Sequence, residues 1–154
     1  MSIFFADEQS VPVPLESLQR LAEVVMSAEG LAADTELSVI LVDVDEISQY
    51  NQRFMGRSGP TDVLAFPVEE LEAGKPPVGF ANGPPVTLGD IFVCPQIVAE
   101  QAVEAGTNME QEMALILTHG LLHLLGYDHD SDPEAERMAD RERALLAAAG
   151  IQLP

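Results

Sequence analysis

The chain has 154 residues, of which 47% are hydrophobic, and its 26 acidic and 7 basic residues give a formal net charge of -19. This length suits one hydrophobic core rather than two, so we expect a single domain spanning residues 1–154. The charge argues against a protein that grips nucleic acid through a broad basic face, because contacts with phosphates dominate such binding. We therefore expect no DNA binding, and any function on nucleic acid must rest on local chemistry.

The sequence also lacks the signals of export. No apolar run approaches the ~20 residues that span a bilayer. Residues 1–10 lack the basic region and the apolar stretch of a secretion signal. The lone Cys94 cannot form an internal disulfide. We therefore expect a cytoplasmic protein without a membrane segment.

The first part of the chain is expected to alternate strands with helices. A short alternation of apolar residues predicts a strand at residues 2–6. Apolar residues at helical spacing predict a helix at 14–30, ended by Gly30. A run rich in β-branched residues predicts a strand at 36–43, and the apolar face of residues 45–55 predicts a short helix.

Two further strands are predicted at 61–68 and 88–94. The segment between them, residues 69–87, is rich in proline and glycine. Such a composition predicts a long loop, which either lies beside the functional site or is partly disordered.

The C-terminal part is predicted to be helical, with helices at 95–106, 108–126 and 132–150. Asn108 can cap the second of these helices in a capping box with Gln111 three residues on, and Asp132 can cap the third. The sequence therefore predicts an α+β fold with about four strands and about five helices.

All three histidines of the chain fall in the stretch THGLLHLLGYDHD, residues 118–130. Four residues advance an α-helix by about 400°, so His119 and His123 lie one turn apart on the same face. Gly126 can take a positive φ and end the helix, which allows the chain to bring His129 back toward the other two.

Three imidazoles at this spacing indicate one zinc ion with a fourth position left for water. That arrangement is typical of catalytic zinc, because structural zinc is normally closed by four protein ligands. A closed structural site is the alternative if Cys94 or Asp128 supplies the fourth ligand. A second alternative is a set of ordinary histidines with satisfied hydrogen bonds.

The metzincin peptidases use the same frame, H-E-x-x-H-x-x-G-x-x-H, with the glutamate after the first histidine as general base. Here Gly120 stands at that position and cannot transfer a proton. The residues therefore favour a reaction other than peptide hydrolysis, and a zinc peptidase with an unusual base is the alternative. Gly120 lies within the helix and is expected to tolerate alanine, whereas Gly126 is not.

Three stretches of the sequence carry a family resemblance. HGLLHLLGYDH, from His119 to His129, resembles the H-G-x-L-H-L-x-G-Y-D-H motif of the YbeY family of bacterial zinc-dependent endoribonucleases. NQRFMGRSGPTDVLAFP resembles the family's N-x-x-[YF]-R-x-x-x-x-P-T-D-V-L-S-F-P, and LGDIFVC resembles its G-D-[IL] strand. The matches extend from Asn51 to His129. The histidine motif is highly specific, and the other two are informative through their order.

The resemblance implies that His119, His123 and His129 bind one zinc ion per chain on a metzincin-like helix. It also implies an enzyme that cleaves single-stranded RNA during ribosomal RNA maturation, at the 3′ end of 16S RNA, and in ribosome quality control.

The chain departs from the family pattern at one position. The family commonly places an arginine, thought to face the RNA phosphate, where this sequence has Met55. A methionine cannot make that contact. Arg57 or Arg53 could point a cation toward the same cleft, and both are candidate catalytic residues.

Several acidic residues near these motifs have other expected roles. Asp62 is expected to close a turn. Asp90 is expected to satisfy a strand end, with the orientation of a histidine as its alternative role, and Asp128 is also a candidate for orienting a histidine. The charges of residues 136–146 are expected to form a solvated helix face.

The expected protein is thus a zinc hydrolase of RNA phosphodiesters, with either an activated water or the ribose 2′-hydroxyl as the attacking group. A non-catalytic ribosome-assembly factor, in which zinc only holds the fold, is a further alternative. Because the chain is so acidic, we expect its substrate to be ribosomal RNA within ribosomal particles. A ribosomal or assembly protein is expected to dock on the acidic surface.

Overall fold

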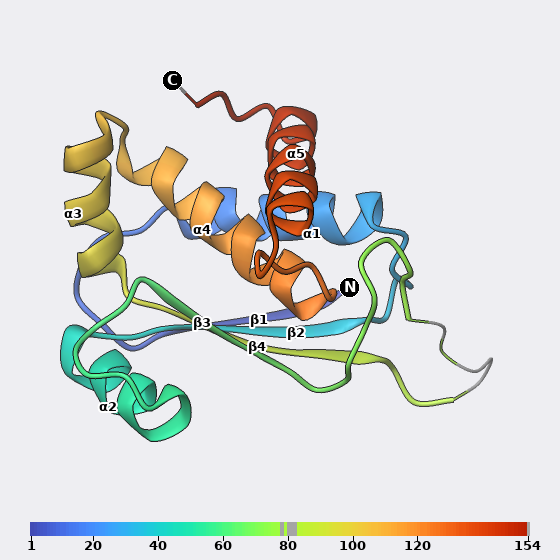
Figure 1. The fold of residues 1–154 in the computed structure, drawn as a ribbon, viewed down its shortest axis with the longest axis horizontal. Helices are drawn as coiled ribbons and strands as arrows, with labels where there is room; N and C mark the ends of the chain where they lie inside the picture. Colours follow the sequence, from blue (N-terminus) through green and yellow to red (C-terminus); the bar gives the residue numbers. More distant parts are fainter. Residues whose placement is uncertain (78, 80–82, 154) are drawn as a thin grey trace.

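The predicted elements are all present in the computed structural model, which describes residues 1–77, 79 and 83–153 (Figure 1). The strands are β1 (Ser2–Asp7), β2 (Glu36–Leu41), β3 (Val63–Pro67) and β4 (Thr87–Val93). The helices are α1 (Leu15–Ala28), α2 (Val44–Met55), α3 (Pro95–Ala105), α4 (Met109–Leu124) and α5 (Asp132–Ala148). Their ends differ from the predicted ends by no more than about two residues. The α+β prediction is therefore confirmed.

The four strands form one sheet in the order β1-β2-β4-β3. The neighbouring strands β1, β2 and β4 are parallel, and β3 runs antiparallel to β4. This order places β3 at an edge of the sheet. Helices α1, α4 and α5 lie on one side of the sheet and α2 lies on the other (Figure 1).

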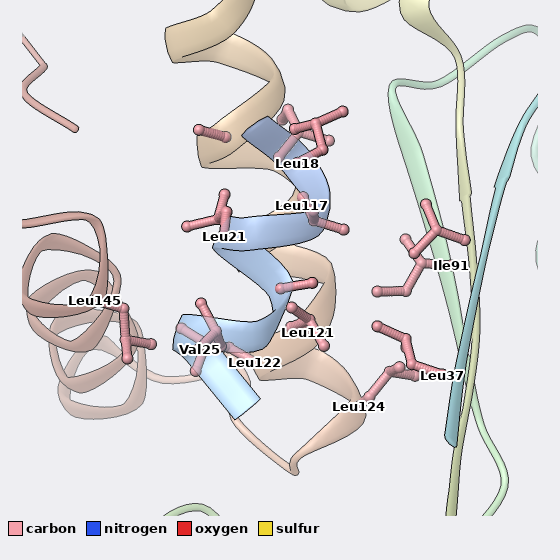
Figure 2. Packing of buried hydrophobic residues seen from close by; sticks show 14 of the residues in the cluster. Leu18, Leu21, Val25, Leu37, Ile91, Leu117, Leu121, Leu122, Leu124 and Leu145 are labelled. Atoms are coloured by element: carbon pink, nitrogen blue, oxygen red, sulfur yellow. The ribbon is translucent and has the colours of Figure 1, made fainter. Parts of the chain in front are cut away.

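Helix α4 occupies the centre of the main core. It packs against β3 and β4 on one side and against α1, α3 and α5 on the others. A helix that is apolar over most of its circumference is a buried helix, and most of α4 is buried in this way. Figure 2 shows α1, α4, α5 and the sheet contributing to this core the side chains of Leu18, Leu21, Val25, Leu37, Ile91, Leu117, Leu121, Leu122, Leu124 and Leu145.

A smaller core fills the space between the other face of the sheet and α2. It is formed by Val42, Ile47, Leu64 and Cys94, which are all buried. The Cys94 side chain is 0% exposed, and burial raises the pKa of its thiol. Cys94 is therefore a small core residue.

The caps of the two C-terminal helices were predicted with different success. Asn108 accepts a hydrogen bond from the backbone N–H of Gln111 at 2.8 Å, and the Gln111 side chain accepts one from the N–H of Asn108 at 3.0 Å. That capping box is confirmed. The cap predicted at Asp132 is wrong, because Ser131 is still extended and its hydroxyl accepts from the N–H of Glu134 at 3.3 Å.

Over the residues that the structure describes, the predicted loop is present from residue 69 to 86, with one isolated bridge between Glu72 and Lys75, and Thr87 already belongs to β4. Residues 78 and 80–82 of the loop lie outside the described part of the chain. None of the described helices is long and apolar enough to cross a membrane.

The expectation that Gly120 tolerates alanine took no account of the sheet that lies beside this residue. A Cβ atom at Gly120 would lie 3.1 Å from Cγ2 of Ile91 and 3.3 Å from its Cδ1. Ile91 lies on β4 and is fully buried. An alanine at Gly120 therefore presses on a side chain that has little room to move, and overpacking of this kind destabilises a core.

Candidate metal centre

The structure brings the three histidines together. Helix α4 carries His119 and His123 on one face, and the chain then turns at Gly126, whose φ is 94°. The turn brings His129 back toward the other two histidines. The ligand atoms of the three side chains all lie within 4.8 Å of one another. The helix and turn expected from the sequence therefore account for the convergence.

The spacing of the imidazoles fits a metal ion. The Nε2 atoms of His119 and His123 lie 3.0 Å apart. Two nitrogens that each lie 2.0–2.1 Å from a tetrahedral zinc ion are about 3.3 Å apart, so the pair needs only a small adjustment. The His129 ring centroid lies 5.2 Å from that of His123 and 5.9 Å from that of His119. The three residues could hold one ion and leave a coordination position open.

The surroundings of His123 favour the neutral imidazole, which is the form that binds a metal ion. Burial is the main cause that lowers its pKa, and the charges of His119 and His129 lower it further. The Asp128 charge and a hydrogen bond with the Tyr127 backbone act in the opposite direction without reversing the shift. A lowered pKa means that protons compete with a metal ion for this ring only at lower pH.

Asp128 shapes the turn that carries His129. Its Oδ1 accepts a hydrogen bond from the His129 backbone N–H at 2.8 Å. Asp128, His129 and Asp130 form a second group with ligand atoms within 4.8 Å of one another, in which Asp128 is half-buried and the other two residues are exposed. Exposed acidic groups of this kind are common on surfaces without an ion.

Cys94 and Asp90 lie away from the histidines. Cys94 belongs to the core beneath α2, so the closed site with this thiol as fourth ligand is not formed. Asp90 is exposed on β4, where Ile91 faces α4 and the alternation of the strand turns Asp90 to the opposite face of the sheet. Asp90 is therefore a surface residue of the sheet and orients no histidine.

Glu142 is the residue near the histidines that sequence reasoning missed. Residues 136–146 were expected to form a solvated face, but the Glu142 side chain is only 14% exposed and its Oε1 contacts Nδ1 of His119. The signal was present in the sequence, because Met138, Glu142 and Leu145 recur at helical spacing and so share one face of α5. Met138 and Leu145 are buried, which makes Glu142 a carboxylate on the packed face.

The histidines open into a cleft of about 880 Å³. One wall is α4, a second is the edge strand β3, and a third is the segment that joins α2 to β3. The lining includes Val63, Ala65 and Pro67 of β3, Glu69, Glu70 and Leu71 of the following loop, and Arg57, Ser58, Pro60, Thr61 and Asp62 before β3. The part of the segment 69–87 next to β3 therefore lies beside the site, as one of the two readings of that loop predicted.

The two candidate arginines have different places. Arg57 lines the cleft, whereas Arg53 is not among its lining residues and its guanidinium lies over the Phe54 ring at 5.2 Å from the centroid. Asn51 and Met55 of α2 both line the cleft. They are four residues apart, so Arg53, two residues from each, projects from the other side of the helix.

Asp62 lines the cleft, and within the described part of the chain its side chain makes no hydrogen bond to a backbone group, so the expected turn closure is not seen. Its backbone carbonyl accepts a hydrogen bond from the Cys94 N–H at 2.9 Å, and its Oδ1 accepts one from the Thr61 hydroxyl at 3.2 Å. These bonds fix the entry of the chain into β3. Asp62 therefore helps to place the cleft wall.

We predict that Gly126→Ala destabilises the protein and weakens metal binding. A Cβ atom at Gly126 would lie 2.0 Å from the Leu71 carbonyl oxygen, and φ is 94°, so either the loop or the turn that carries His129 must move. A non-glycine residue at positive φ costs about 1 kcal/mol or more before the clash is counted. Urea denaturation and calorimetric titration with zinc measure the two effects.

The matched control is Gly106→Ala at the end of α3. Gly106 has a similar φ of 70° but its Cβ would meet nothing within 4 Å. The difference between the two variants isolates the contact with Leu71. Equal losses of stability in both, with unchanged zinc affinity, would contradict the role assigned to this turn.

The chain matches the family model described as endoribonuclease YbeY over residues 4–150. It is 45% identical to the endoribonuclease YbeY of Thermobifida fusca over 147 residues, which cover 96% of this chain and 93% of the relative. It is also 45% identical to that of Nocardia farcinica, with 100% of this chain and 96% of the relative covered. The solved structure of TM1509 from Thermotoga maritima is similar, with a TM-score of 0.63 and 32% identity over 96% of this chain and 88% of that one. The chain therefore belongs to the endoribonuclease YbeY family.

Proposed function

We propose that the protein is a zinc-dependent endoribonuclease in which His119, His123 and His129 bind one zinc ion per chain. The observation that carries this proposal is the convergence of the three imidazoles in an open cleft, in a chain that belongs to a family of endoribonucleases. Three neutral imidazoles are a donor set suited to zinc, and they leave room for a reacting group.

The three histidines and Arg57 have different tasks in this proposal. The histidines bind the metal, which when bound acts as a Lewis acid on water and on a phosphoryl oxygen. Arg57 donates to the phosphate of the RNA, since it lines the same cleft. It takes the place of the arginine that the family resemblance puts at Met55. Gly120 offers no proton-transfer group, which disfavours peptide hydrolysis.

The electrostatics of the cleft favour a substrate that is presented by a partner. Arg57 is the one lysine or arginine among its described lining residues, which also include Asp62, Glu69, Glu70 and Asp128. With a net charge of -19, the chain cannot attract a free polyanion over a distance. We propose that it cleaves single-stranded ribosomal RNA within ribosomal particles in the cytoplasm. Docking of a basic ribosomal or assembly protein on the acidic surface then supplies the recognition.

The proposed role follows from this substrate. Cleavage inside a ribosomal particle suits the maturation of ribosomal RNA, including the 3′ end of 16S RNA, and ribosome quality control.

Replacing His123 with alanine is predicted to remove the zinc. The described structure brings only two other histidines to the site, and the chain contains no fourth one. Elemental analysis after gel filtration should fall from about one zinc ion per chain to a small fraction of that. Asp130→Ala, which disrupts the exposed acidic group beside the site, should keep its zinc. An undiminished zinc content in the His123 variant would contradict the assignment of His123 as a zinc ligand.

The two arginines provide a matched pair. We expect Arg57→Ala to lower kcat/KM for RNA cleavage by about ten- to a hundredfold, since a charge-assisted hydrogen bond contributes about 1.5–3 kcal/mol. Arg53→Ala should change kcat/KM by no more than about twofold, because Arg53 lies outside the cleft. Similar losses in both variants would mean that the cation acts through the general field of the protein and not through a contact in the cleft.

Presentation of the RNA should control the rate and the cut site. We predict slow and poorly selective cleavage of isolated RNA, and faster and more selective cleavage of the same RNA within a ribosomal particle at matched salt. His123→Ala is the control against a contaminating nuclease. Equal rates and equal cut sites in both settings would remove the need for a docking partner. Cleavage of casein in place of RNA would instead favour a peptidase.

A further inference from the structure

The Glu142 carboxylate lies behind the histidine cluster, on the side of the His119 ring that faces away from His123. Its Oε1 contacts Nδ1 of His119, while the His119 Nε2 lies 3.0 Å from the Nε2 of His123. Building on the zinc site proposed above, we propose that Glu142 is a positioning residue for His119. It fixes the tautomer and the ring orientation that present Nε2 to the metal.

The tautomer follows from hydrogen-bonding chemistry. A neutral imidazole carries one N–H, and an ionised carboxylate can only accept. The contact therefore requires His119 to donate from Nδ1, and this leaves the lone pair on Nε2. Nε2 is the nitrogen that meets His123. The proton is thus held on the nitrogen that the metal does not use.

The packing of α5 holds Glu142 in place. Met138 lies one turn before it and Leu145 about one turn after it on the same face, and both are buried. Helix α5 packs against α4. The contacts between these two helices therefore place the carboxylate next to His119. With 14% of its side chain exposed, Glu142 has little freedom to adopt another position.

The neighbouring arginines already have partners. Arg141 pairs with Glu29, the residue that follows α1, and Arg143 pairs with Asp140 on the same helix. Within the described part of the chain, His119 is the one side chain that hydrogen-bonds to Glu142. A largely buried carboxylate without a positive partner is costly. An imidazole that binds a cation provides that partner, and the carboxylate in turn makes the ring a stronger ligand.

Glu142 could instead be a purely structural contact that holds α5 against α4 and has no effect on metal binding. Measurements of the His119 tautomer and of zinc affinity distinguish this structural role from the positioning role. We would compare Glu142→Ala and Glu142→Gln with Asp140→Ala, a control that removes an exposed carboxylate from the same helix. The readouts are the zinc dissociation constant by chelator competition and the nitrogen-15 spectrum of the imidazoles in metal-free protein at a pH where they are neutral.

The expected result is a zinc dissociation constant about 10–100-fold higher in Glu142→Ala. Glu142→Gln keeps an acceptor oxygen but loses the charge, so its constant should lie between those of the alanine variant and the native protein. Asp140→Ala should match the native protein. The spectrum of the native protein should show the His119 proton on Nδ1, and Glu142→Ala should move part of it to Nε2.

Unchanged zinc affinity and an unchanged tautomer in a folded Glu142→Ala would overturn this role, as would a native His119 that carries its proton on Nε2. If the alanine variant does not fold, Glu142→Gln decides, because native zinc affinity together with a His119 proton that has moved to Nε2 in that variant equally contradicts the role. A native protein that binds no zinc would refute the proposed metal site. The tautomer in metal-free protein would still test the link between Glu142 and His119.

Discussion

Helix α4 packs against the edge of the sheet on one side and against α1, α3 and α5 on the others, and most of its side chains are buried. The side that remains open is the one that carries His119 and His123. A buried helix cannot rotate or slide without disrupting packing on every face. The two imidazoles are therefore held at a fixed separation by the core itself, and the third needs only the short turn at Gly126 to join them.

The same packing creates the cleft and fixes its electrostatic character. Because β3 is an edge strand that lies against α4, the space beyond it stays open to solvent next to the histidines. The loop that follows β3 brings Glu69 and Glu70 to the rim, and the connection from α2 brings Arg57. The positive potential of the site thus depends on one arginine and on the ion that the histidines are proposed to bind. In a chain this acidic, substrate binding and catalysis must come from short-range contacts.

Periodicity in the sequence was enough to predict what depends on local structure. The nine elements, the capping box at Asn108 and the approach of His129 to the helix all follow from spacing and turn chemistry. What could not be predicted depends on contacts between distant segments. Glu142 lies 23 residues beyond His119, and only the docking of α5 shows that its face is packed. The one-residue shift of the α5 cap to Ser131 is different, because Ser131 with Glu134 three residues on is a local capping pattern that the sequence already contained.

The close contact between α4 and the sheet at Gly120 limits what this site can become. A Cβ atom there would point at the Ile91 side chain and toward Val63, and both belong to the sheet. Gly120 also lines the cleft, but a longer side chain on the same vector would first meet Ile91. A glutamate introduced after the first histidine would therefore press on a buried side chain of the sheet, and overpacking of this kind costs stability. The contact between α4 and β4 at this position thus opposes the side chain that a peptidase of this frame uses as its base.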